Sequence, residues 1–221
     1  GFIAHKSNKI KYFCSGTQIF DDILEGIEKA KKFIFIQFFI VADGVLLKRF
    51  IDLLAKKVSE GVEVRFIYDD MGSHKTFSKK SKKRLIEVGV KIKAFNKFLP
   101  IYAAIMNYRD HRKIVSIDGK VAFTGGINLA DEYINETKKY GHWKDTGVRL
   151  EGPAVDRFTH MFLNMWNAFC PTEEDYTPYR FDRRLQANTR TEAVVVPYGD
   201  SPLDHENVGE TVYLELLAQA T

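Results

Sequence analysis

The first 95 residues alternate between amphipathic segments of helix length and apolar segments of strand length. Apolar side chains recur at helical spacing in three segments: 17–31, 45–60 and 78–88. The strand-like runs between and after them are 33–41, 62–68 and 90–95. Helices that cross over between strands produce this alternation in α/β domains. We therefore expect an α/β fold with a mixed, largely parallel sheet flanked by helices on both faces.

Composition narrows the function classes. The 221 residues are 45% hydrophobic, enough for a sizeable core, and the net charge is +4. That excess suits an anionic substrate or membrane surface but is too small to indicate a nucleic-acid binder, so no nucleic acid is expected. Two cysteines form no disulfide framework and indicate a reducing compartment. We identify neither a signal peptide nor a membrane-spanning helix, and Gly1–Ala4 does not resemble a natural start, so further residues are expected upstream.

The second half of the chain predicts a domain boundary. A hairpin over 109–124, turning at Asp118–Gly119, precedes a strand over 145–150 and a helix over 153–169. We assign residues 1–170 to a first domain and the polar segment 171–192 to a linker. Residues 193–196 resemble a new strand and 208–220 a new helix, an echo of 12–30. We therefore interpret 193–221 as the start of a second repeat.

One spaced pattern carries the chemistry. It reads His-x-Lys-x4-Asp-x6-Gly-Gly-x-Asn, formed by His111, Lys113, Asp118, Gly125, Gly126 and Asn128. Because side chains alternate faces along a strand, His111 and Lys113 share a face, whereas Asp118 has the opposite parity. The hairpin returns the two glycines beside His111, and they allow the backbone to approach closely. An imidazole, an ammonium and a carboxamide are therefore expected together at one strand end.

These residue types suit phosphoryl chemistry. A histidine serves as a nucleophile or a general acid/base, while lysine and asparagine donate to phosphoryl oxygens. Asp118 is expected to be structural, near the turn, together with Gly125 and Gly126. A histidine beside a lysine is by itself usually only a strand end, so the indication depends on the full pattern.

The pattern and its surroundings resemble the phospholipase D superfamily with its HKD signature, and bacterial cardiolipin synthases in particular. The resemblance runs from about residue 12 to 167. It is carried by the segments EGVEVRFIYDDMGS (60–73), NYRDHRK (107–113), GGINLADEYI (125–134), GHWKDTGVRLEGPAV (141–155) and FLNMWN (162–167).

The resemblance implies phosphatidyl transfer in two steps through a phosphohistidine, without metal or other cofactor. It makes His111 the nucleophile or the acid, and it places Lys113 and Asn128 on the phosphoryl oxygens. Asp145 matches the carboxylate that holds the second nitrogen of the histidine, although by sequence alone it is equally a strand cap. The acidic pair Asp69–Asp70 is interpreted as a loop end rather than a metal site. Gln37 stands where the family commonly has a glutamate, which puts a charged role there in doubt.

Two segments are candidates for lipid contact. A basic helix is expected either to meet anionic headgroups or to be a solvated face, and it contributes Lys79, Lys80, Lys82 and Lys83. The segment 98–106 is apolar for a loop. It is expected to line an acyl groove, to enter a membrane interface or to pack in the core, through Phe98, Ile101, Tyr102 and Met106.

The leading hypothesis is a phosphatidyltransferase that makes cardiolipin from two phosphatidylglycerol molecules and releases glycerol. Its partners would be phosphatidylglycerol, an anionic membrane on the cytoplasmic side, and a second HKD domain of the same chain or of a homodimer. A phospholipase D-type hydrolase or a phosphatidylserine synthase-type transferase shares the core. A homodimeric single-HKD nuclease and an inactive membrane-binding module are the alternatives from other classes. With one HKD motif, the chain is expected to hold half of an active site and to have little activity alone.

Overall fold

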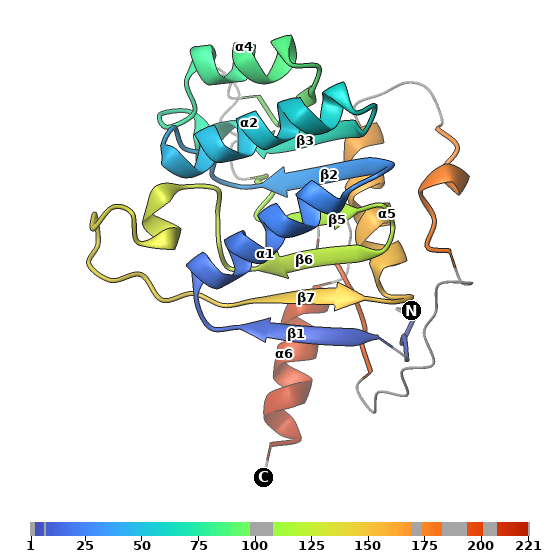
Figure 1. Cartoon of the computed structure of the whole chain (residues 1–221). Helices are drawn as coiled ribbons and strands as arrows, with labels where there is room; N and C mark the ends of the chain where they lie inside the picture. The colour runs from blue at the N-terminus through green and yellow to red at the C-terminus, as the bar shows by residue number, and fades with distance from the viewer. Residues whose placement is uncertain are drawn as a thin grey trace.

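The chain folds around one seven-stranded sheet with the strand order β1-β7-β6-β5-β2-β3-β4 (Figure 1). This computed structural model describes residues 3–6, 8–97, 108–168, 174–182, 194–200 and 207–220. The strands are β1 (Lys9–Phe13), β2 (Phe33–Phe38), β3 (Glu63–Asp69), β4 (Lys91–Phe95), β5 (Ile114–Ile117), β6 (Val121–Gly125) and β7 (Gly147–Glu151). Within the described residues, no helix combines the length and the apolar character needed to cross a membrane.

The sheet is mixed, as predicted, but the prediction that it is largely parallel was wrong. Only the β2–β3 and β3–β4 pairs are parallel, and the other four pairs are antiparallel. The parallel pairs are those joined by the crossover helices that the sequence pattern indicated. β5 and β6 form the predicted hairpin, β7 extends it, and β1 adds to the far edge of β7. The alternation of helices and strands stops at β4, so the direction of the later strands could not be inferred from it.

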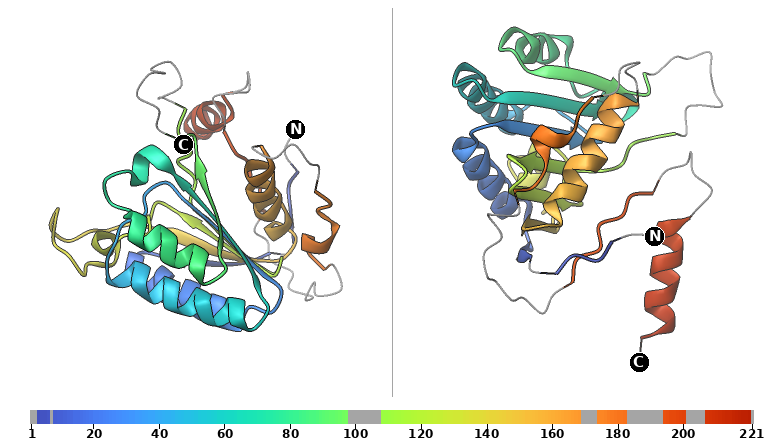
Figure 2. Two further views of the ribbon diagram at one scale, coloured as in Figure 1. Left: turned by 90° about the horizontal axis from the view of Figure 1, so that it is seen from above. Right: turned by 90° about the vertical axis from the view of Figure 1, so that its right-hand side faces the viewer.

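Helices cover both faces of the sheet, which confirms that part of the prediction (Figure 2). One face carries α1 (Gly16–Lys29), α2 (Val45–Ser59) and α4 (Lys79–Glu87), and the other carries α5 (Val155–Asn167). A short α3 (Asp70–Ser73) follows β3. The larger apolar core lies under the three helices, and two smaller clusters lie under α5.

The amphipathic pattern of α1 explains how it packs. Ser15 caps the helix by accepting a hydrogen bond from the backbone N–H of Gln18. Its apolar side chains occupy one stripe that is buried against the sheet: Ile19, Phe20, Ile23 and Ile27. This stripe places the helix beside the end of β6, next to the candidate site.

The part of the predicted linker that the structure describes packs on the α5 face of the sheet. Tyr179, in the turn η3 (Thr177–Tyr179), lies with its ring centroid 5.2 Å from that of Phe33. Further along, Val195 exchanges two backbone hydrogen bonds with His5. The helix predicted over 208–220 is α6 (Val208–Ala218); none of its residues is buried, and it stands away from the sheet (Figure 2). The second repeat therefore stays a prediction.

Candidate active site

The predicted site residues gather at one end of the sheet. His111 and Lys113 directly precede β5, Asn128 follows β6 by three residues, and Asp145 precedes β7 by two. Because β5, β6 and β7 are antiparallel neighbours, the start of β5, the end of β6 and the start of β7 lie at the same end of the sheet. The hairpin pairs Ile114 with Thr124, so the two halves of the pattern lie side by side.

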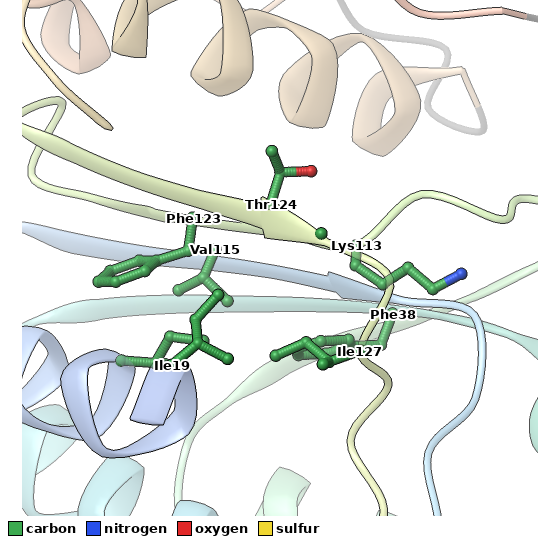
Figure 3. Close-up of a pocket in the computed structure, with 9 residues that line it drawn as sticks. Ile19, Phe38, Lys113, Val115, Phe123, Thr124 and Ile127 are labelled. Atoms are coloured by element: carbon green, nitrogen blue, oxygen red, sulfur yellow. The ribbon is translucent and has the colours of Figure 1, made fainter. Parts of the chain in front are cut away.

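His111 and Lys113 contact each other. The Lys113 Nζ atom lies 3.1 Å from Nδ1 of His111 and donates to the His111 carbonyl oxygen at 2.6 Å. The Lys113 stem lines a small apolar pocket between α1 and the sheet, and Figure 3 shows its ammonium pointing away from Ile19 and Phe123. The ring of Phe39 lies against the His111 imidazole, with centroids 4.7 Å apart. An exposed imidazole therefore stands beside a buried ammonium.

Burial sets the charge states of this pair. It lowers the pKa of Lys113 to about 8, while the Asp110 and Asp145 carboxylates oppose that shift. Burial, and then the Lys113 ammonium, lower the pKa of His111, whereas Asp110 and Asp69 raise it. A neutral imidazole beside a cation is therefore favoured near neutral pH. Such a pair combines a nucleophile with a donor for an anionic oxygen.

Asn128 is buried and its carboxamide is already engaged. Its Oδ1 atom accepts from the Ile40 backbone N–H at 3.0 Å, and its Nδ2 atom donates to the Tyr133 hydroxyl at 2.7 Å. An amide nitrogen has a second N–H, which donates to no residue that the structure describes and can therefore serve a ligand. Tyr133 was not predicted as a site residue. It lies in the turn η2 (Asp131–Ile134), only five residues after Asn128.

Asp145 lies close to the cluster without contacting His111. Its carboxylate accepts from Trp143 Nε1 at 3.1 Å and from the Thr146 backbone N–H at 2.7 Å. A Cβ atom on Gly126 would lie 2.2 Å from Oδ1 of Asp145, so this close approach requires the glycine. Among the hydrogen bonds of the described residues, none joins Asp145 to His111. Its role as the histidine's carboxylate partner stays a prediction.

Asp118 points away from the cluster and holds the start of β2. Its φ is +55°, and its carboxylate accepts from the backbone N–H groups of residues 31, 32 and 33 at 2.7–2.9 Å. Three donors on one carboxylate join the hairpin turn to the neighbouring strand, 85 residues earlier in the chain. The third letter of the motif therefore makes contacts that stabilise the sheet.

We expect Asp118→Ala to lower the free energy of unfolding by about 1–2 kcal/mol, because three backbone donors lose their acceptor. Asp118→Asn is the matched control, since asparagine tolerates positive φ and keeps one acceptor oxygen. Urea unfolding of the two variants beside the parent chain measures the difference. Equal stability of Asp118→Ala and the parent chain would contradict this role.

The candidate lipid contacts divide into two groups. Phe98, Ile101, Tyr102 and Met106 all lie outside the described residues. On α4, Lys79, Lys80 and Lys83 are exposed. Lys82 instead turns inward, with its Nζ atom 4.5 Å from the ring centroid of Tyr68 and 3.9 Å from Asp70. Three of the four lysines thus face solvent.

A buried polar cluster behind His111 was not predicted. Gln37, Asp69 and Asp110 are almost fully buried and linked by hydrogen bonds to one another and to the Arg109 and Arg112 side chains. Gln37 was identified in the sequence only as a departure from the resemblance, and Asp69 as a loop end. In the sequence, the only indication of this cluster is that a charged residue, Asp110, directly precedes the motif histidine. Its partner Gln37 lies 73 residues away in the chain.

The comparisons with known proteins identify the family of this chain. The family described as cardiolipin synthase, PLD-like domain, matches residues 23–166. An uncharacterized protein of Streptococcus mutans is 48% identical over 100% of this chain and 47% of its own length. A cardiolipin synthase of Oceanobacillus iheyensis is 44% identical over 73% of this chain and 34% of its own length. The chain belongs to the phospholipase D-like domain family of the cardiolipin synthases.

A solved structure supports the fold independently. Phosphatidylserine synthase of Haemophilus influenzae superposes with a TM-score of 0.58 at 13% identity, over 91% of this chain and 48% of that one. The chain spans between a third and a half of the length of the relatives named above.

Proposed function

We propose that this chain carries one half-site of a phosphatidyltransferase that makes cardiolipin from two phosphatidylglycerol molecules. The observation that carries the proposal is the His111–Lys113 contact at the end of the central strands, in a chain of the cardiolipin synthase family. The Asn128 side chain lies at the same end and has one N–H without an acceptor among the described residues. Phosphatidylglycerol supplies the anionic phosphodiester that such donors would bind.

The reaction has two steps. The free imidazole nitrogen of His111 attacks phosphorus, the bond from phosphorus to the glycerol oxygen breaks, and a second histidine protonates that oxygen. The hydroxyl of a second phosphatidylglycerol then attacks the phosphohistidine, gives its proton to the second histidine and frees His111. Lys113 and Asn128 hold the non-bridging oxygens, where they stabilise negative charge in both transition states. His111 and its counterpart can exchange these roles.

Because the reaction requires two histidines, this chain would supply half of the active site. One HKD motif supplies one histidine, and the second would come from a further HKD domain of the same polypeptide or from a second copy of the chain. Residues 1–170 would form the first domain, 171–192 the linker and 193–221 the start of the second. The longer relatives leave room for such a domain.

We further propose that the enzyme works on the cytoplasmic side of an anionic membrane. The exposed Lys79, Lys80 and Lys83 on α4 offer positive charge to lipid headgroups. Lys82 contributes less, because its ammonium lies over aromatic rings.

Purified chain incubated with labelled phosphatidylglycerol in vesicles tests the proposal. We expect a labelled, acid-labile adduct on His111, and cardiolipin only where two motifs pair. His111→Ala should reduce both by about 10³-fold or more. Phosphatidic acid as the sole lipid product would instead identify a hydrolase, and cleavage of plasmid DNA that is lost in His111→Ala would identify a nuclease.

The half-site proposal has its own test. Sedimentation analysis of the same samples relates cardiolipin formation to the oligomeric state. Rapid turnover by a monomer would contradict the need for a second motif. Lys113→Arg is a control for the assay with labelled phosphatidylglycerol. It tests the effect of charge alone, because arginine keeps the positive charge but has a different shape.

A further inference from the structure

The segment that presents His111 has no regular hydrogen-bonded structure of its own. Residues 108–113 precede β5 and belong to no helix or strand. The position of the imidazole therefore depends on side-chain contacts around this segment. The contacts that the structure describes converge on Asp110, the residue directly before the histidine.

Asp110 is 4% exposed and is held on three sides. Its backbone N–H donates to Oδ2 of Asp69 at 3.0 Å, and its Oδ1 atom accepts from Nε of Arg112 at 2.9 Å. Its Oδ2 atom accepts from Nε2 of Gln37. Asp69 in turn accepts from Nη1 of Arg109 at 3.3 Å. Two buried carboxylates are thus matched by two guanidinium groups, which allows both to be ionised.

Gln37 connects this segment to the centre of the sheet. It lies on β2, paired with Ile114 at the start of β5, and is fully buried. Its Oε1 atom has no hydrogen-bond partner among the described residues. Turning the amide round would place that oxygen against the Asp110 carboxylate, which accepts but does not donate when ionised. Within the described part of the chain, this buried oxygen stays without a partner while the amide N–H faces Asp110, an arrangement that favours the contact with Asp110.

We propose that Gln37 is a positioning residue: its amide N–H holds the ionised Asp110 carboxylate, and this buried pair fixes the segment that presents His111. The inference deepens the proposed function, on which it rests for the role of His111. It also explains why a neutral amide stands at position 37. A glutamate there would meet Asp110 as a second carboxylate in a buried site, where one of the two must take up a proton.

Exchanging the amide of Gln37 and the carboxylate of Asp110 between the two positions tests the pairing. Gln37→Glu should lower Tm by about 6–12 °C at pH 8, because two buried carboxylates then meet. The loss should be smaller at pH 5, because the shared proton has a raised pKa in the folded state and stabilises the fold below it. Adding Asp110→Asn to Gln37→Glu restores a carboxylate–amide pair and should recover most of the lost Tm.

The titration of the His111 ring, followed by NMR, tests positioning separately from stability. Asp110→Asn alone should lower the pKa of His111, because a nearby negative charge is removed, and Gln37→Glu with Asp110→Asn should return it toward the parent value. Thr159→Val is the matched control, since Thr159 on α5 forms a buried hydrogen bond with Ser116 on β5. It should lower Tm without moving the His111 titration.

These readouts need no transfer activity, so they remain decisive if the proposed transferase function fails. Recovery of Tm together with the His111 titration in the double variant supports the inference. A Gln37→Glu chain as stable as the parent at pH 8 overturns the pairing. Recovery of Tm with an unchanged His111 titration in every variant overturns the positioning role and leaves the pair structural only.

Discussion

Replacing Arg65 by alanine is expected to lower the free energy of unfolding by about 3–5 kcal/mol, because it removes hydrogen bonds to two glutamates together with the packing of a buried side chain against aromatic rings. Arg65 is 4% exposed and lies on β3, with its guanidinium 5.2 Å from the ring centroids of both Phe35 and Tyr179. It forms paired hydrogen bonds with Glu174 and a 3.0 Å bond from Nε to Glu63. This one side chain joins the sheet to the described part of 171–192.

Arg65→Met is the matched control, since methionine fills similar space without charge. Glu63 and Glu174 are partly exposed and can regain water, so this variant should lose less than Arg65→Ala. Urea unfolding measures both. A loss below about 1 kcal/mol in Arg65→Ala would show that the Arg65 contacts with Glu63 and Glu174 stabilise the fold no more than ordinary surface ion pairs do.

The same contact predicts acid sensitivity. Hydrogen bonds from Arg65 lower the pKa of Glu174 to about 2, below the ordinary value of 4.5. A carboxylate with a depressed folded-state pKa stabilises the fold above 4.5, and that contribution is lost as pH falls from 4.5 toward 2. The stability difference between the parent chain and Arg65→Met should therefore shrink over this range. An unchanged difference would show that Glu174 does not titrate with the contact.

Local periodicity predicted most of the elements correctly but not the pairing of the sheet, in which four of the six strand pairs are antiparallel. The helix over 45–60 and the hairpin turning at Asp118–Gly119 are encoded by neighbouring residues. The placement of β1 beside β7 depends on packing between residues about 140 positions apart, for which no local pattern exists. Strand parity placed His111 and Lys113 together because it too is a local property.

The contacts that surround the site show the same division. The hydrogen bonds of Asp118 were expected near its own turn, yet they reach residues 31–33 at the start of β2. The partner of Asp110 is Gln37, and that of Asn128 is the Ile40 backbone. Each partner became identifiable only after the β2–β5 pairing was known, because that pairing brings distant segments to one edge.

Replacing Lys113 by methionine is expected to stabilise the fold while removing the hydrogen-bond donor that the proposed function assigns to the phosphoryl oxygens. Lys113 is 5% exposed and its stem lines an apolar pocket, so its ammonium is charged in a place that favours a neutral group. Its folded-state pKa of about 8 lies below the ordinary 10.5. A lysine with a lowered folded-state pKa destabilises the fold fully below pH 8, and this penalty is relieved as pH rises from 8 to 10.5. We expect Lys113→Met to gain about 1–3 kcal/mol at pH 7.

Lys57→Met is the control that separates burial from function. Lys57 is 1% exposed, but its Nζ atom donates to the Glu28 carbonyl oxygen at 2.9 Å and pairs with Glu60, so its replacement should destabilise the fold. Urea unfolding at pH 7 and pH 10 compares the two variants with the parent chain. The gain in Lys113→Met should be smaller at pH 10. Loss of stability in both variants would mean that Lys113 contributes to folding as Lys57 does. The burial of the Lys113 ammonium would then give no support to a role in binding substrate. The opposite signs that we expect reflect charge: Lys57 is paired with the Glu60 carboxylate, whereas Lys113 contacts uncharged atoms of His111, and the anion that the proposed function assigns to it is the phosphoryl group of the substrate.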